Sequence, residues 1–222
     1  MTHSAAMSRI SIALSVALAL AASTATVAGQ LAARSAEEWI KTLENPSRIA
    51  GLKVDQIVGS LRLKPGDTVA DLGAGAGAFS IPLARAVAPS GKVYAVEIEQ
   101  GLVDYIGRKA ATQKVTNVQP LLGKFTDPAL PARDVDLVFM HDVLHHVQDR
   151  QPYLKNAALY IKPGGRFAFV EFHAALGPHR ADPALQITQV QLRQWMTDLG
   201  FEQTDDLRLF EDRWFVIFTR RP

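Results

Sequence analysis

Short apolar runs alternate with segments of helical periodicity along most of this 222-residue chain. Apolar runs bounded by glycine, proline or charged residues are typical of β-strands. The first five predicted strands are 68–72, 92–97, 118–122, 134–140 and 166–172. The run at 134–140 is almost entirely apolar, which indicates a parallel strand buried on both faces.

Helical patterns fill the spaces between these strands. Apolar residues recur three and four positions apart in predicted helices at 79–87, around Leu102–Ile106 and at 153–161. Two helices precede the first strand: one over 35–43, and one opened by Asn45-Pro46 that continues to Leu61. After an irregular segment at 173–187, a helix capped by Thr188 ends at Gly200, and strands at 206–210 and 214–219 form a hairpin.

This alternation predicts an α/β fold: a doubly wound, mostly parallel seven-stranded sheet with a C-terminal antiparallel hairpin, in a Rossmann-like arrangement. Composition agrees with a globular domain, because 48% of residues are hydrophobic and 21% are charged. The formal net charge is only +2 and no basic run is present, so a nucleic-acid partner is not expected. The chain has no cysteine, which excludes disulfides and thiolate sites.

The N-terminus has the pattern of an export signal. Arg9 is the one charged residue among residues 1–33, an apolar run follows at 10–22, and small side chains at Thr26 and Ala28 precede Gly29. We interpret residues 1–29 as a signal peptide or an N-terminal anchor, and expect export to the periplasm. A membrane contact is expected only through this segment, if it is not cleaved. Residues 30–60 are then N-terminal helices that cover the site, and residues 61–222 are the cofactor-binding domain.

A glycine-rich turn follows the first predicted strand, in the sequence Asp71-Leu72-Gly73-Ala74-Gly75-Ala76-Gly77. Glycine permits left-handed backbone and close approach of a ligand, and the N–H groups that start the next helix bind polar ligand atoms. Glu97, at the end of the second strand, can accept hydrogen bonds from both hydroxyls of a ribose. Dinucleotide-dependent oxidoreductases share this combination, so it does not identify the ligand by itself.

Three features favour a different cofactor: Asp71 precedes the first glycine by two residues, two helices precede the motif, and no second domain follows for a hydride acceptor. The chain resembles a class I S-adenosylmethionine-dependent methyltransferase of the small-molecule type, like those that act on ubiquinone and menaquinone precursors. The motifs that carry the resemblance are Asp71-x-Gly73-x-Gly75-x-Gly77, Glu97, the segment Asp136–Val147, and the segment Leu154–Phe169.

The resemblance implies a role for each matching residue. Asp71 orients the glycine loop and the amino group of S-adenosylmethionine, and Glu97 holds the ribose hydroxyls. The predicted cofactor-binding residues are Asp71, Gly73, Ala74, Gly75, Gly77, Glu97, Ile98, Phe125 and His141. Ile98 and Phe125 flank the adenine. Many relatives have an acidic residue where this chain has Lys124, to which we assign no contact with the base.

Methyl transfer from a sulfonium is an in-line displacement that depends mainly on positioning, and an oxygen or nitrogen nucleophile also gives up a proton. His141, His145 and His146 are the candidate bases, because they lie at or after the end of the fourth strand. His141 and His145 have the i, i+4 spacing of metal ligands on a helix, but no third ligand is evident, so no metal site is predicted.

The acceptor is expected to be a small molecule whose identity the sequence leaves open. Two alternatives also stay open: an NAD-type oxidoreductase, and a non-catalytic cofactor-binding module on the same fold.

Overall fold

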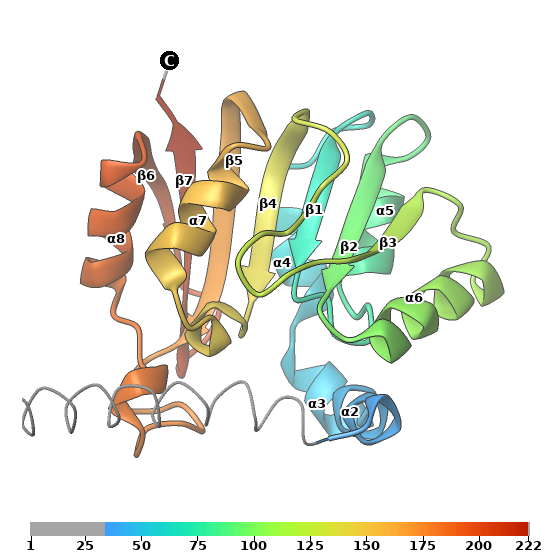
Figure 1. The fold of residues 1–222 in the computed structure, drawn as a ribbon, viewed down its shortest axis with the longest axis horizontal. Coiled ribbons are helices and arrows are strands. Elements are labelled where there is room, and N and C mark those ends of the chain that lie inside the picture. The colour runs from blue at the N-terminus through green and yellow to red at the C-terminus, as the bar shows by residue number, and fades with distance from the viewer. Residues whose placement is uncertain (1–33, 222) are drawn as a thin grey trace, which may run out of the picture. The chain divides into compact units, whose positions relative to one another are not determined.

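Seven strands form one sheet in the order β3-β2-β1-β4-β5-β7-β6 in the computed structural model, which describes residues 34–221 (Figure 1). Strands β1 to β5 are parallel, and β7 lies antiparallel to both β5 and β6. The predicted fold class is therefore confirmed. The strands are β1 (Thr68–Leu72), β2 (Lys92–Glu97), β3 (Val118–Leu122), β4 (Val135–His141), β5 (Ile161–Phe172), β6 (Phe201–Leu207) and β7 (Arg213–Arg220).

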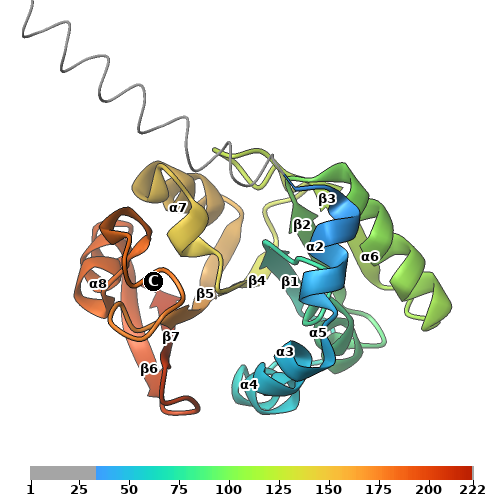
Figure 2. The ribbon, with the colours of Figure 1, turned by 90° about the horizontal axis from the view of Figure 1, so that it is seen from below.

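Helices cover both faces of this sheet. Figure 2 looks toward the strand ends and shows α7 and α8 on one face, with α4 and α5 on the other. The helices are α2 (Ala36–Leu43), α3 (Pro46–Gly51), α4 (Val54–Ser60), α5 (Ser80–Val87), α6 (Gln100–Thr112), α7 (Arg150–Ala158) and α8 (Gln189–Asp198), with short 3-10 turns η1 (Leu144–His146) and η2 (Pro183–Leu185). The chain divides after Ser35, and the part from Ala36 onward forms one compact unit. Within residues 34–221, no helix is long and apolar enough to cross a bilayer.

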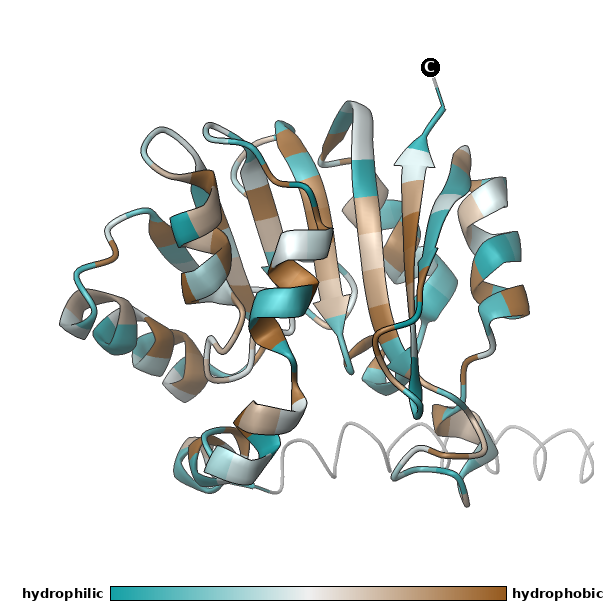
Figure 3. Ribbon diagram, turned by 180° about the vertical axis from the view of Figure 1, so that it is seen from behind, coloured by the Kyte–Doolittle hydropathy of each residue, from teal (hydrophilic) through white to brown (hydrophobic). Residues whose placement is uncertain are grey.

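Alternate residues of the central strands enter two hydrophobic clusters, one on each face of the sheet. In β4, Val138 and Met140 pack with α7 and α8, whereas Leu137 and Phe139 pack with α4 and α5. Figure 3 shows the resulting concentration of hydrophobic residues in the strands. Burial on both faces explains why β4 is apolar along almost its whole length.

The parallel strands end at one edge of the sheet, and the order of connections reverses between β1 and β4. Ligands of doubly wound proteins bind at such a reversal, outside the carboxyl ends of the strands. Helices α2 and α3 and the loop at 173–187, far apart in sequence, both lie beyond this edge (Figure 1).

The second predicted helix is two helices in the structure, which corrects the expectation of one helix to Leu61. Asn45 caps α3 as expected, because its side chain accepts a hydrogen bond from the Ser47 N–H at 3.0 Å. Lys53 then has a left-handed backbone, with φ of 51°, and α4 begins after it. Buried Leu52 and the hydrogen bond from Lys53 Nζ to the Leu209 carbonyl fix this break, which helical periodicity does not reveal.

Two strands begin about five residues earlier than predicted. Ile161, which the sequence pattern assigns to a helix, pairs with Val135 in β5 before a register shift that accommodates the Lys162–Gly165 turn. β6 begins at Phe201 rather than at residue 206. It is an edge strand whose residues are partly exposed except for Phe201, so its polar sequence concealed it. The Thr188 capping box is confirmed.

Replacing Gly91, at the turn into β2, should destabilise the folded protein. A Cβ there would lie 2.5 Å from the carbonyl oxygens of both Asp67 and Val87. Backbone oxygens cannot move aside as side chains do, so Gly91→Ala should lower the free energy of unfolding by about 1–3 kcal/mol. Urea denaturation measures this change.

Gly59→Ala is the matched control, because a Cβ at this exposed helical position meets nothing within 4 Å. It should leave stability unchanged or raise it by up to about 1 kcal/mol. Equal effects of the two substitutions would contradict this account of Gly91.

Candidate functional site

The glycine turn forms a tight loop at the carboxyl end of β1. Gly73, Gly75 and Gly77 all have positive φ, at 72°, 58° and 73°. The Gly73 N–H donates to the Val96 carbonyl at 2.9 Å, which fixes the loop to β2. A Cβ at Gly73 would lie 2.4 Å from a methyl group of Val143, so glycine is also required for close packing against the segment after β4. Ala74, within the loop, is buried.

Helix α2 lies against the other side of the same loop. A Cβ at Gly75 would be 3.2 Å from Cδ1 of Leu43. Lys109 of α6 donates both to the Glu44 carboxylate, at 2.8 Å, and to the Ala76 carbonyl, at 3.0 Å. The sequence placed helices near the site but gave no sign of Leu43 or Lys109, because these contacts join segments remote in sequence.

Asp71 is a buried carboxyl group at the root of the loop. Its Oδ2 accepts a hydrogen bond from the Ser80 hydroxyl at 2.6 Å. Burial raises the pKa of Asp71 to about 7; the Ser80 hydrogen bond opposes this rise, and the nearby Glu97 charge adds to it. Near neutral pH, Asp71 is thus poised between its protonated and ionised forms.

Glu97 joins the end of β2 to the glycine loop. One carboxylate oxygen accepts from the Gly75 N–H at 2.6 Å, and the other accepts from the Ile98 N–H at 3.0 Å. Burial raises the pKa of Glu97 although both N–H groups favour the ionised form. Each oxygen retains a free lone pair for a ligand hydroxyl.

Two exposed apolar side chains follow the neighbouring strands β2 and β3. Ile98 is 38% exposed and Phe125 is 59% exposed. Exposed large hydrophobic side chains beside a polar loop indicate a surface that an apolar ring can cover. Lys124, also exposed, lies in the turn closed by backbone hydrogen bonds between residues 124 and 127.

His141 is buried among aromatic rings. Its ring centroid lies 4.7 Å from that of Phe79, and its Nε2 is buried with no hydrogen-bond partner among the described residues. Burial, together with Arg213 and Arg48, lowers the pKa of His141 to about 3. An imidazole with so low a pKa is a weak proton acceptor near neutral pH.

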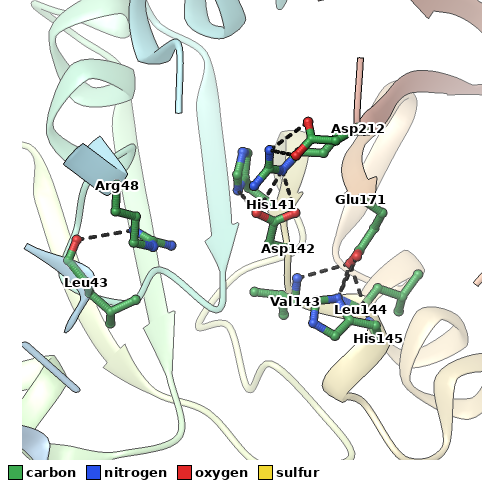
Figure 4. A network of polar contacts seen from close by, with 10 residues as sticks. Leu43, Arg48, His141, Asp142, Val143, Leu144, His145, Glu171 and Asp212 are labelled. Carbon is green, nitrogen blue, oxygen red and sulfur yellow. Dashed lines mark hydrogen bonds and ion pairs between the residues drawn. The ribbon is translucent and has the colours of Figure 1, made fainter. Parts of the chain in front are cut away.

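Asp142 connects β4 to β7 through Arg213. The Arg213 Nε donates to both Asp142 oxygens, at 3.2 and 3.1 Å, and its guanidinium lies 3.8 Å from the Phe172 ring centroid. Burial raises the pKa of Asp142 to about 6 against the effect of Arg213. Arg48, which donates to the Leu43 carbonyl, lies across from this group (Figure 4). Arg48 and Arg213 were not anticipated, because nothing in the sequence distinguishes them from surface arginines.

Glu171, at the end of β5, organises the turn after β4. Its Oε2 lies 2.6 Å from His145 Nδ1, and its Oε1 accepts from the N–H groups of Val143 and Leu144, at 3.0 and 2.6 Å (Figure 4). His145 and Glu171 are both buried. The carboxylate thereby fixes the orientation of the His145 ring.

Two more histidines, His146 and His179, lie beside this pair. Ring centroids of His145 and His146 are 4.1 Å apart, and His179 lies 5.2 and 5.3 Å from them. Burial and these neighbours lower the pKa of His146 to about 3. His145, Glu171 and His179 also line a pocket beneath the 173–187 loop, together with Phe172, His173, Ala174, Gly177, Pro178, Arg180, Leu185, Gln186 and Ile187.

The three histidines predicted as candidate bases, His141, His145 and His146, therefore lie in two separate places. Asp142 has a left-handed backbone with φ of 53°, so His141 and His145 do not share a helix face. His141 packs beside Phe79, whereas His145 and His146 join His179. His179 was missed because it comes from the irregular loop.

Comparison with known proteins gives a family for this chain. A family model described as a methyltransferase domain matches residues 63–211. A demethylmenaquinone methyltransferase of Symbiobacterium thermophilum is 31% identical over 117 residues, which are 52% of this chain and 47% of that protein. Aklanonic acid methyltransferase DauC of Streptomyces is 30% identical over 104 residues, 47% of each protein. The chain spans about half the length of these two relatives.

Solved structures confirm the architecture. A S-adenosylmethionine-dependent methyltransferase from Aquifex aeolicus superposes with a TM-score of 0.74 at 24% identity, over 85% of this chain and 100% of that one. This likeness supports the fold alone. Because the family model spans more than half of the sequence, the chain belongs to the methyltransferase domain family, as a class I S-adenosylmethionine-dependent member.

Proposed function

We propose that the protein transfers a methyl group from S-adenosylmethionine to a small-molecule acceptor. The observation that carries this proposal is the union of Glu97 with the glycine loop, through the 2.6 Å hydrogen bond to the Gly75 N–H. This hydrogen bond holds Glu97, the carboxylate that we propose binds the ribose, against the left-handed glycine turn. Both lie where the order of strand connections reverses in the sheet. Family membership supports this cofactor over NAD.

The residues present fit the cofactor along its length. Asp71 would face the amino group, Gly73 to Gly77 would run beneath the methionine part and the ribose, and Glu97 would hold the ribose hydroxyls. Exposed Ile98 and Phe125 supply apolar surfaces for the adenine. The unpartnered Nε2 of buried His141 is a polar atom that a ligand or water in the site would satisfy.

Bound in this way, S-adenosylmethionine would supply an activated methyl group for in-line displacement by a lone pair of the acceptor, with S-adenosylhomocysteine as the other product. Alignment of the acceptor is the main task of the protein. Helices α2 and α3 and the 173–187 loop lie beyond the carboxyl edge of the sheet (Figure 1). We propose that these segments cover the acceptor. Where a proton must leave the acceptor, His145 is the best-oriented candidate, because Glu171 holds its ring.

The relatives support a small organic acceptor. Their names specify demethylmenaquinone and aklanonic acid, and a third relative, from Saccharothrix syringae, is a nocamycin O-methyltransferase. We therefore propose a small organic molecule as the acceptor of this chain.

Calorimetric titration with S-adenosylmethionine and S-adenosylhomocysteine tests the proposal. Both ligands should bind, and NADH should not. Glu97→Gln should weaken binding of both ligands by about tenfold or more, because the charge-assisted hydrogen bonds to the ribose hydroxyls are lost. Glu202→Gln, an exposed acid on edge strand β6, is the matched control and should change nothing. No binding of either ligand at high micromolar concentration would refute the cofactor. Binding without methyl transfer to any acceptor would favour the non-catalytic module.

Asp71 should make this affinity depend on pH. Its pKa of about 7 means that the carboxyl is mostly protonated below neutral pH and cannot pair with the cofactor's ammonium group. S-adenosylhomocysteine should therefore bind roughly tenfold more weakly at about pH 6 than at about pH 7.5. Asp71→Asn should bind weakly at both pH values, with a flat profile. An unchanged slope in Asp71→Asn would show that another group is responsible.

We also propose that the chain is exported to the periplasm, with cleavage before Gly29. The support is the sequence pattern of residues 1–29, which lie outside the residues that the structure describes. Mass spectrometry of the protein from fractionated cells should find a mature N-terminus at Gly29 in the periplasmic fraction. Ala28→Tyr should accumulate as the uncleaved precursor. An intact N-terminus in the cytosol would contradict export.

A further inference from the structure

We propose that His145, His146 and His179 form a binding site for one divalent transition-metal ion of the Zn²⁺ type. One ring nitrogen from each histidine lies within 4.8 Å of one from each of the others. Among residues 34–221, this is the one group of three or more metal-ligating side chains so arranged. Its members come from η1 and the 173–187 loop, outside the glycine loop that we assign to the cofactor.

The donor set indicates the kind of metal. Three imidazole nitrogens suit zinc and its neighbours in the transition series, and not magnesium or calcium, which prefer oxygen. Ligand nitrogens about 2.0–2.1 Å from a tetrahedral ion lie roughly 3.3 Å apart, so the rings need only small rotations to close on an ion. His146 and His179 are partly exposed and have room for such rotations.

Glu171 prepares His145 for this role. Its Oε2 lies 2.6 Å from Nδ1 of His145. Because an ionised carboxylate only accepts hydrogen bonds, this pairing favours the tautomer with hydrogen on Nδ1, which leaves Nε2 available to a metal. A carboxylate on the far nitrogen of a ligating histidine fixes the tautomer and raises the basicity of the ligand. The buried Glu171 charge also offsets part of the charge of an ion.

Arg150 holds the two contributing segments together. Its guanidinium donates to the carbonyls of His145, at 2.9 Å, and of Ala184, which joins η1 to the segment around η2. The 173–187 loop is closed further by hydrogen bonds from Asp182 N–H to the His179 carbonyl and from Gln186 to the Arg180 carbonyl, both at 2.9 Å. The third ligand is thus carried on a braced loop.

Charges around the cluster are balanced. Glu171 and Asp182 act on His179, and Asp142 acts on His145, while Arg150 and Arg180 are the basic groups beside the cluster. Both guanidinium groups have carbonyl or solvent partners, since Arg150 donates to backbone oxygens and Arg180 is exposed. A divalent ion therefore enters surroundings that carry no excess positive charge.

Three protein ligands leave one coordination position for an exogenous atom, as in catalytic rather than structural zinc sites. His145 and His179 both line the pocket beneath the 173–187 loop, so an exogenous ligand would reach the ion from this pocket. If the proposed methyl transfer is correct, an acceptor oxygen or nitrogen would bind there. His145 would then hold the metal rather than receive a proton, because Nε2 cannot do both.

Metal titration of the purified full-length chain, made without a polyhistidine tag, tests the site directly. Zn²⁺ should bind at one equivalent, and Co²⁺ should give the visible absorption of a tetrahedral nitrogen site. His146→Ala and His179→Ala should each weaken binding by at least about tenfold, since losing a ligand costs no less than losing its supporting partner. His173→Ala is the matched control, because this exposed histidine lines the same pocket but lies outside the cluster. The His173→Ala variant should bind Zn²⁺ as tightly as the unmodified protein.

Circular dichroism establishes that each variant is folded, and His179→Ala, in a loop, is the variant least able to disturb the core. Absence of binding at high micromolar metal would overturn the proposal. So would binding that survives both His146→Ala and His179→Ala, or binding that His173→Ala reduces equally. None of these three outcomes decides whether S-adenosylhomocysteine binds, so the metal site and the cofactor site are tested separately.

Discussion

The buried carboxylate of Glu171 is the interaction on which the arrangement of the site depends. It accepts hydrogen bonds from the Val143 and Leu144 N–H groups and pairs with the His145 ring. An unpaired buried carboxylate would be costly, so these partners are held in place strongly. The turn after β4 is therefore positioned by β5, its neighbour in the sheet.

The same turn also restricts the glycine loop, because Val143 packs against Gly73. Val143 occupies the space that a side chain at Gly73 would need, and Leu43 of α2 approaches Gly75 from another side. Lys109 then ties α2 to the loop through Glu44 and the Ala76 carbonyl. Three segments remote in sequence are thus fitted around one short turn, and at Gly73 glycine is required by packing as well as by backbone conformation.

Much of this architecture could be predicted from the sequence because it follows local rules. The apolar runs gave the five parallel strands, the Asn45 and Thr188 caps gave two helix starts, and Asp71 to Glu97 identified the type of loop. Features that depend on tertiary contact could not be foreseen. Lys53 adopts a left-handed backbone within an apparently continuous helix, and His179 meets His145 only through the folding of an irregular loop.

The contact between Val143 and Gly73 also has a thermodynamic meaning. Val143 belongs to the turn that carries His145, while Gly73 belongs to the proposed cofactor loop, so the two candidate ligand sites share one packed boundary. Packed side chains transmit small displacements because no free volume absorbs them. Thermodynamic linkage is reciprocal. If a ligand bound at one site changes the affinity of the other site for its ligand, then occupation of the second site changes the affinity of the first by the same factor. The absence of a side chain at residue 73 thereby brings the two candidate ligand sites into direct packing contact.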